Sequence, residues 1–194
     1  MKRIAVFCGS SVGFNKIYAL EAKKLGAYMA DKHITLVYGG ANRGLMGILA
    51  DSVLVNKGEA IGVIPDLIRK EEIAHTGLTQ LIITKKMSER KEVISKYADG
   101  YIALAGGFGT LDELFEALTL SQLGIESKPV GILNTRGYFD PMISQLDMMV
   151  KEGFLKAENR DMLLVEQTVE ALIERMEKHQ AVKVSKIVNK IASE

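Results

Sequence analysis

A glycine-rich segment that ends in two acidic residues has the clearest chemical potential in this sequence. It reads Ala105-Gly106-Gly107-Phe108-Gly109-Thr110-Leu111-Asp112-Glu113. Glycine lets the backbone turn tightly and approach a ligand closely, and a helix that starts there presents N–H groups without intrahelical partners. These donors and the helix dipole favour an anion. The segment therefore predicts a phosphate-binding turn.

Glu113 has two interpretations on sequence alone. It lies three residues after Thr110, which is the spacing of a capping box, so it could serve only to cap a helix. Alternatively, its carboxylate lies one helical turn from the bound phosphate and faces the sugar attached to it. Glu116 follows three residues later, so two acidic side chains could line one wall of the site.

Arg90 is predicted to face inward from a second helix. It lies three, four and seven residues before apolar positions of that helix, so it occupies the first position of the buried stripe. Because an arginine stays charged at physiological pH, an inward one needs an anionic or oxygen-rich partner. That partner is either a ligand or a carboxylate, Glu113 or Glu116. The neighbouring Lys91 is expected to be solvated.

Two further small-residue clusters follow apolar runs and lead into helices, namely Cys8-Gly9-Ser10-Ser11 and Tyr38-Gly39-Gly40-Ala41-Asn42-Arg43-Gly44. One such cluster alone would be explained by glycine ending a strand. Three of them favour a common ligand site. None matches GxxxxGK[ST] or a clean GxGxxG, which argues against ATP hydrolysis and dinucleotide redox chemistry.

The remaining reactive side chains do not form a recognisable site. Cys8 is expected to be a small buried hydrophobic residue, because no histidine near it has the context of a catalytic base. His33, His75 and His179 are scattered along the chain. Since no spacing typical of zinc ligands occurs, we predict no metal site.

Short apolar runs bounded by glycine alternate with segments of helical period. The predicted strands are Ile4–Cys8, Ile34–Tyr38, Ala60–Ile64, Leu81–Thr84, Tyr101–Leu104, Val130–Leu133 and Met162–Val165. The predicted helices are Asn15–Lys32, Gly44–Lys57, Ser88–Tyr97, Leu111–Gly124, Pro141–Glu152 and Gln167–Lys178. This alternation predicts an α/β fold, with a mainly parallel sheet of about seven strands and helices on both faces. All three glycine clusters would then gather at the carboxyl edge of the sheet, where ligands bind in such folds.

Length and composition favour one soluble domain. The chain has 194 residues, which fits a nucleotide-binding domain over residues 1–180 and a C-terminal extension over residues 181–194. Apolar residues at helical spacing in the extension suggest either a helix that docks on a partner subunit or a frayed terminus. The 25 basic and 24 acidic residues indicate no nucleic-acid surface or membrane anchor. No apolar run reaches the ~20 residues of a membrane span. With a single cysteine, we expect a cytoplasmic protein.

Together these motifs resemble the LOG family, the cytokinin riboside 5′-monophosphate phosphoribohydrolases, whose members are often labelled lysine decarboxylases. The family pattern PGGxGTxxE corresponds to Ala105–Glu113, and its M-x-x-R-K pattern corresponds to Met87–Lys91. The opening Phe7–Ser11, the Gly39-Gly40 pair and the segment Gln122–Gly131 are also similar. The sequence departs from the pattern in three places, with Ala105 for proline, Ala41 for a third glycine and Ser88 for a frequent histidine.

The resemblance implies a function and a set of site residues. It implies a Rossmann-like, doubly wound homodimer that needs no cofactor and cuts the N-glycosidic bond of a cytokinin-type or AMP-like nucleoside 5′-monophosphate. The catalytic pair would be Arg90 and Glu113. The predicted substrate-binding residues are Ser10, Gly40, Met87, Lys91, Gly106, Gly107, Gly109, Thr110 and Glu116.

Two other functions compete with this hypothesis. The first is a nucleotide sensor or carrier that has the same phosphate-binding turn and performs no chemistry. The second is a pyridoxal-phosphate amino-acid decarboxylase. That chemistry needs a Schiff-base lysine inside the pocket. The lysines of this chain lie mainly in polar helical runs, and the glycine-rich turn leads to a glutamate, which disfavours the second alternative.

Overall fold

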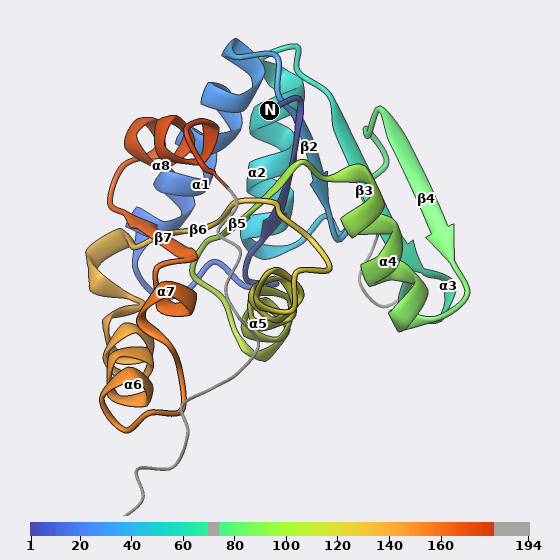
Figure 1. Ribbon diagram of the computed structural model, residues 1–194. Coiled ribbons are helices and arrows are strands. Elements are labelled where there is room, and N and C mark those ends of the chain that lie inside the picture. Colours follow the sequence, from blue (N-terminus) through green and yellow to red (C-terminus); the bar gives the residue numbers. More distant parts are fainter. Residues whose placement is uncertain (70–73, 181–194) are drawn as a thin grey trace, which may run out of the picture.

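The fold is organised around one sheet of seven parallel strands. In the computed structural model, which describes residues 1–69 and 74–180, the strand order is β4-β3-β2-β1-β5-β6-β7 (Figure 1). The strands are β1 Arg3–Phe7, β2 Thr35–Tyr38, β3 Ala60–Pro65, β4 Gln80–Thr84, β5 Gly100–Ala103, β6 Val130–Leu133 and β7 Leu163–Glu166. All seven predicted strands are confirmed, each to within one residue at either end. Their apolar, non-alternating sequences reflect burial on both faces.

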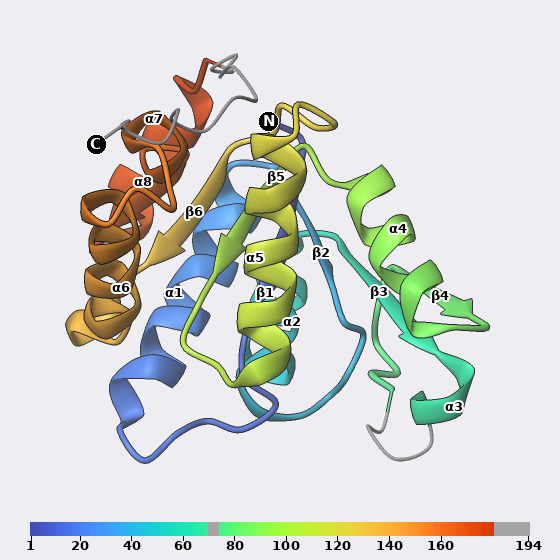
Figure 2. The same ribbon diagram turned by 60° about the horizontal axis from the view of Figure 1, so that its bottom comes forward.

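Helices cover both faces of the sheet. The longer ones are α1 Lys16–Asp31, α2 Gly44–Val55, α4 Met87–Tyr97, α5 Phe108–Gln122, α6 Asp140–Lys151 and α8 Val169–Glu177. Helices α1, α2 and α8 contribute to one hydrophobic core, and α4, α5 and α6 to the other. Figure 2 shows α5 crossing β1 and β5 on one face, with α1 and α2 on the other. The doubly wound α/β architecture predicted from the sequence is therefore confirmed.

Three short elements were not predicted, namely α3 Asp66–Arg69, α7 Ala157–Arg160 and the 3₁₀ helix η1 Thr135–Gly137. Segments of three or four residues are too short for a helical period to show in the sequence. The predicted C-terminal extension, residues 181–194, lies outside the described residues and stays a prediction. Among the described residues, no helix is long and apolar enough to cross a bilayer.

The start of α5 corrects one sequence-based interpretation. The helix begins at Phe108, three residues before the predicted start, and Gly107 is its N-cap. Thr110 therefore lies in the first turn and Glu113 in the second, so the two do not form a capping box. The prediction was wrong because glycine's low helical propensity placed the boundary after the glycines. Glu113 therefore does not cap α5.

The strand order reverses between β1 and β5, and this switch point positions the site. The chain winds from β1 toward β4 in one direction and from β5 toward β7 in the other. The turns that follow β1 and β5 are joined directly, because the Gly9 N–H donates to the Ala105 carbonyl at 3.0 Å. In open α/β sheets a ligand crevice forms at this point.

Candidate active site

A cavity of about 290 Å³ lies at the switch point, on the carboxyl edge of the sheet. The residues that line it come from the β1 turn and from α2, α4 and α5. They are Cys8, Gly9, Ser10, Met46, Met87, Arg90, Lys91, Gly107, Phe108, Gly109, Thr110, Asp112 and Glu113. Eight of the eleven predicted site residues are among them. The exceptions are Gly40, Gly106 and Glu116.

Arg90 and Glu113 meet in this cavity from two different helices. The Arg90 Nη1 atom of α4 lies 4.0 Å from the Glu113 Oε1 atom of α5, and their side chains are only 12% and 16% exposed. The guanidinium is anchored by its Nε–H, which donates to the Val63 carbonyl at 3.1 Å. Because 4.0 Å exceeds hydrogen-bonding distance, a substrate oxygen can still approach either group. Both sequence interpretations of Arg90 thus apply: it faces the ligand edge, and it pairs with a carboxylate.

The glycine cluster after β2 makes room for this arginine. A Cβ atom on Gly39 would lie 2.2 Å from Arg90 Nη2 and 3.2 Å from Met46 Sδ. Gly44, whose φ is +57°, packs in the same way against the backbone of Ser10 and Ser11. The cluster therefore acts mainly by close packing that shapes the cavity.

Burial perturbs the acidic group of the pair. Desolvation raises the pKa of the Glu113 carboxyl above its ordinary value of 4.5, although the nearby charges of Arg90 and Lys91 lower it. A carboxylate held in a poorly solvated place interacts strongly with any charge that develops beside it. Perturbed acids of this kind concentrate at functional sites.

Lys91 is not solvated, contrary to the sequence-based expectation. Its Nζ atom lies 2.7 Å from Asp112 Oδ2 and 2.8 Å from Glu116 Oε2, and the side chain is 24% exposed. The polar sequence around Lys91 gave no sign of its two carboxylate partners, which come from α5. Lys91 thus joins the two helices that carry Arg90 and Glu113.

The glycine-rich turn opens toward the cavity where the sequence predicts a phosphate. A Cβ atom added to Gly107 or Gly109 would meet nothing within 4 Å, so packing inside the chain does not explain these glycines. Thr110 is buried beneath the turn, and Ser10 is exposed beside it. The start of the 15-residue helix α5 supplies N–H groups and a positive dipole end.

Three predicted site residues lie elsewhere. Gly40, with a φ of +77°, packs against Gly62 and Val63 of β3. Gly106 belongs to the turn but does not line the cavity, and a Cβ there would collide with Thr110 Oγ1 at 2.1 Å. Glu116 pairs with Lys91 and faces a neighbouring groove.

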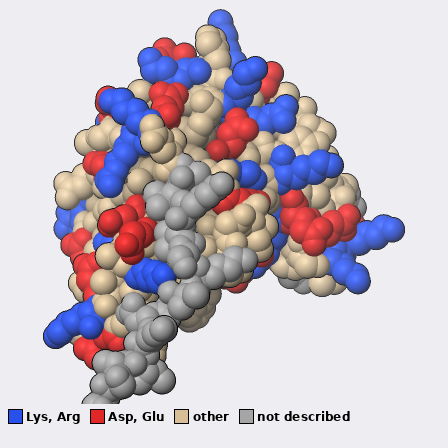
Figure 3. Space-filling view, in the orientation of Figure 1, with Lys and Arg blue, Asp and Glu red and all other residues tan. Residues whose placement is uncertain are grey.

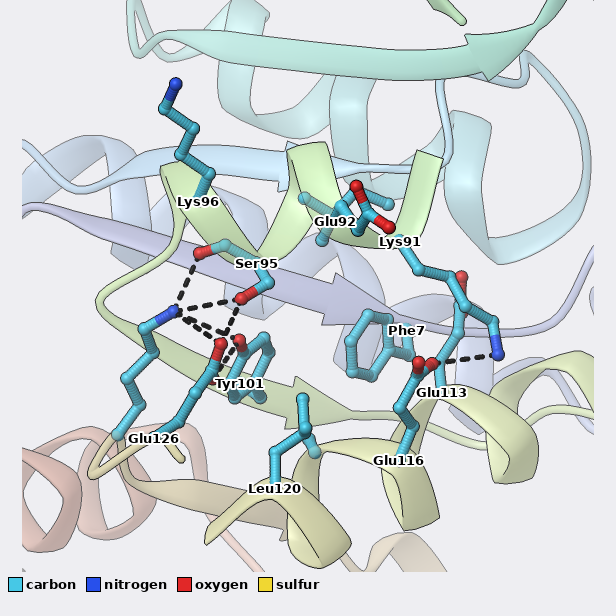
Figure 4. Close-up of a pocket in the computed structure, with 13 residues that line it drawn as sticks. Phe7, Lys91, Glu92, Ser95, Lys96, Tyr101, Glu113, Glu116, Leu120 and Glu126 are labelled. Carbon is cyan, nitrogen blue, oxygen red and sulfur yellow. Dashed lines mark hydrogen bonds and ion pairs between the residues drawn. The ribbon is translucent and has the colours of Figure 1, made fainter. Parts of the chain in front are cut away.

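That groove runs between α4 and α5 and has a volume of about 410 Å³. Its floor includes the stacked rings of Phe7 and Tyr101, whose centroids are 5.8 Å apart. Figure 4 shows Lys91 and Glu116 at one end and Ser95, Tyr101 and Glu126 at the other. Glu113 and Lys91 line both hollows, so the groove borders the cavity that holds the catalytic candidates.

Sequence reasoning missed other residues that line the cavity. Phe108 is 94% exposed at its rim, although a phenylalanine at a helix start is ordinarily expected to be buried. Met46 and Asp112 also line the cavity, and neither is among the predicted site residues. Cys8 is buried, as predicted, and burial together with the charge of Glu113 raises the pKa of its thiol. A thiol held protonated in this way is a poor nucleophile.

One face of the molecule is electrostatically mixed. In the view of Figure 3, lysine and arginine are interspersed with aspartate and glutamate, and they form no continuous basic surface on that face. Among the described residues, no group of three or more histidine, cysteine, aspartate or glutamate side chains is arranged to hold a metal ion.

Comparisons with known proteins agree with the motifs. A family model described as "Possible lysine decarboxylase" matches residues 46–176. The chain is 41% identical over 177 residues to "Probable cytokinin riboside 5′-monophosphate phosphoribohydrolase LOGL1" of Oryza sativa subsp. japonica, covering 91% of this chain and 79% of the relative. It is 40% identical over 176 residues to the cytokinin riboside 5′-monophosphate phosphoribohydrolase LOG1 of Arabidopsis thaliana, covering 91% and 83%.

Solved structures share the fold at lower identity. The molybdenum cofactor binding protein from the phototrophic bacterium Rippkaea orientalis superposes with a TM-score of 0.68 at 22% identity. The match covers 91% of this chain and 96% of that protein. At this identity the likeness extends to the fold alone.

Proposed function

The chain belongs to the LOG family of cytokinin riboside 5′-monophosphate phosphoribohydrolases, and from this premise we propose that it hydrolyses the N-glycosidic bond of a purine nucleoside 5′-monophosphate. Water adds its hydroxyl to C1′ of the ribose, and the departing base takes up a proton, which gives the free base and ribose 5-phosphate. One observation carries the proposal: the buried pair of Arg90 and Glu113 lies in the cavity that the glycine-rich turn borders.

Glu113 is proposed to act on the ribose. Cleavage of an N-glycosidic bond builds positive charge on the sugar, as in an oxocarbenium ion. A carboxylate in a poorly solvated cavity stabilises that charge, holds the ribose hydroxyls or activates the attacking water. The raised pKa of Glu113 supports a role in proton transfer.

Arg90 is proposed to orient the Glu113 carboxylate and to stabilise groups of the substrate. With a pKa above ~12, a guanidinium does not give up a proton. Its anchor on Val63 leaves it facing Glu113 across 4.0 Å. It can therefore fix the carboxylate, bind a substrate oxygen or stabilise the departing base.

The phosphate is proposed to supply binding energy away from the reacting bond. Gly107, Gly109 and the start of α5 offer N–H donors, and the hydroxyls of Ser10 and Thr110 lie beside them. Binding energy from this remote group holds C1′ against Glu113. A nucleoside without the phosphate is then a poor substrate.

The base is proposed to lie at the rim of the cavity. Met87 and Phe108 begin α4 and α5, and their side chains are 46% and 94% exposed. Both line the cavity, and Met46 lies deeper. Thioether and aromatic surfaces suit a flat purine, with or without a substituent on N6.

A decarboxylase that uses pyridoxal phosphate is poorly supported by the lysine in the cavity. A Schiff base needs a lysine that readily becomes neutral. Although burial lowers the pKa of the Lys91 ammonium, its hydrogen bonds to Asp112 and Glu116 raise the pKa overall. Lys91 is therefore held as a cation between two carboxylates.

The proposal is tested by incubating the pure protein with AMP and with an N6-modified AMP. Release of free base together with an equal amount of ribose 5-phosphate is the expected result, and the ratio of the two rates identifies the preferred base. Tight binding of both nucleotides without base release would make the protein a nucleotide sensor or carrier.

A further inference from the structure

A tyrosine on the far side of the phosphate-binding turn has no counterpart among the predicted site residues. The connection from β6 to α6 brings Tyr138 to a second hollow of about 310 Å³ at the same edge of the sheet. This hollow is lined by Tyr138, Tyr18 and Leu45, by residues 9–13 and by residues 105–107. It shares Gly9, Ser10 and Gly107 with the candidate active site. The glycine-rich turn therefore forms a thin wall between two hollows.

Tyr138 is bonded to the backbone of that wall. Its hydroxyl donates to the Gly106 carbonyl at 2.5 Å. The following peptide bond is trans, as are all described peptide bonds of the chain, and a trans peptide is planar with its C=O and N–H pointing in opposite directions. Because the Gly106 carbonyl is directed at Tyr138, the N–H of Gly107 in the same peptide points away from Tyr138.

The position of Tyr138 is itself fixed. The next residue, Phe139, is 1% exposed, and its N–H donates to Asn134 Oδ1 at 2.8 Å. The Asn134 amide in turn donates to Asp140 Oδ1 at 2.7 Å. The Tyr138 ring packs edge-on against Phe139 and Tyr18, with centroids 5.1 and 5.6 Å away. The hydroxyl is thus presented by a connection tied into the core.

Glycine turns need such support. Gly106 and Gly107 lack side chains that would restrict the peptide between them, so its orientation is set by what it bonds to. The Gly9 N–H holds the preceding peptide through the Ala105 carbonyl at 3.0 Å. Tyr138 holds the next one. Two consecutive carbonyls are therefore fixed from outside the turn.

We propose that Tyr138 is a positioning residue that sets the Gly107 amide for binding the phosphate group of the substrate. The inference rests on the proposed function only for the identity of that phosphate ester. Tyr138 does not touch the reacting atoms, so it acts on affinity for the phosphate and leaves the chemistry of the glycosidic bond unchanged.

The test is Tyr138→Phe, which removes the hydroxyl and keeps the ring packing. The KM for AMP and the dissociation constants of ribose 5-phosphate and inorganic phosphate, measured by calorimetry, are expected to rise about threefold to tenfold. The kcat for AMP should change less than about twofold, and the slow rate on adenosine should not change. Tyr28→Phe, on α1 where its ring faces Lys32, is the matched control and should leave all these values unchanged.

The outcomes separate the two proposals. Weaker phosphate binding in Tyr138→Phe without any hydrolysis by the wild type would support the role of Tyr138 and remove the proposed activity. Hydrolysis by the wild type with unchanged phosphate affinity in Tyr138→Phe would remove the positioning role. A lower melting temperature with unchanged affinities would assign Tyr138 to stability alone.

Discussion

At the scale of single residues, Glu113 and Arg90 form a pair in which neither charge is fully satisfied by the other. The 4.0 Å between Nη1 and Oε1 and the small exposed fractions of both side chains leave a buried carboxylate with a raised pKa. A purely structural ion pair would gain from a closer approach and a true hydrogen bond. The separation between the two charges leaves room for a substrate oxygen to approach either group.

The first prediction concerns turnover. Glu113→Gln keeps the size of the side chain and removes its charge, so the rate of base release should fall by about 100- to 10,000-fold. Binding of AMP should stay within a few-fold of the wild type, because the phosphate turn is intact. Glu174→Gln, at an exposed position of α8 paired with Lys178, is the control and should keep full activity. A folded, fully active Glu113→Gln protein would contradict the role of Glu113.

The second prediction concerns stability and pH. In the folded protein the pKa of Glu113 lies above 4.5, its value in the unfolded chain. As pH rises from 4.5 through the folded pKa, the unfolded chain holds fewer protons than the folded protein. Ionised Glu113 therefore destabilises the folded protein, and this cost is complete above the folded pKa. Glutamine carries no such cost. The melting temperature of Glu113→Gln relative to wild type should therefore increase from pH 4 to pH 8.

The pKa of Glu174 is shifted in the opposite direction to that of Glu113, so Glu174 serves as the comparison. Its hydrogen bond to Lys178 lowers its pKa in the folded protein, so ionised Glu174 favours folding above the unfolded pKa. The melting temperature of Glu174→Gln relative to wild type should fall slightly over the same pH range. A Glu113 variant that behaves like the Glu174 variant would show that the carboxylate is stabilised by its surroundings.

At the scale of elements, the site depends on how α4 and α5 approach each other at the switch point. Lys91 joins the helices through Asp112 and Glu116, and Gly39 gives the Arg90 guanidinium its place beside β2. The glycine cluster after β2 was predicted to help bind the ligand. Its main role is to leave room for the Arg90 side chain.

The third prediction tests that space. In Gly39→Ala the new methyl group would lie 2.2 Å from Arg90 Nη2, so the guanidinium must move from its anchor. Activity should fall at least about tenfold, since small displacements of a positioned group are costly. Gly124→Ala is the control: its φ of +69° makes alanine strained, with open space around the Cβ. It should cost about 1 kcal/mol of stability and leave activity unchanged. Wild-type activity in Gly39→Ala would show that Arg90 needs no fixed place.

The elements were largely predictable because their signals are local. Buried parallel strands such as β1 contain continuous apolar runs, and Gly9 directly follows the apolar run Ile4–Cys8. The start of α5 was missed because the low helical propensity of Gly109 argues against a helix that the structure nevertheless forms there. The environment of Lys91 was missed because its partners, Asp112 and Glu116, lie on α5, which is distant from α4 in the sequence. The 4.0 Å between Arg90 and Glu113 could not be obtained from spacing, since it joins residues of separate βα units.

At the scale of the whole molecule, the doubly wound order brings the β1, β2 and β5 turns together at one edge. β1 and β5 are neighbours in the sheet, although about one hundred residues separate them in sequence, and β2 pairs with β1 on the other side. Parallel strands and the alternation of strand and helix were enough to predict this edge. Homodimerisation, implied only by the family resemblance, stays a prediction that the mass of the protein in solution will test.

The central claim is that phosphate binding at the glycine-rich turn drives cleavage by Arg90 and Glu113. The most direct test is the ratio of kcat/KM for AMP to kcat/KM for adenosine, measured as adenine released by the same pure protein. We expect a ratio of at least about 1,000, because the phosphate supplies the binding energy that positions the ribose. Equal values for the two substrates, or adenine release that does not need the phosphate, would contradict the account.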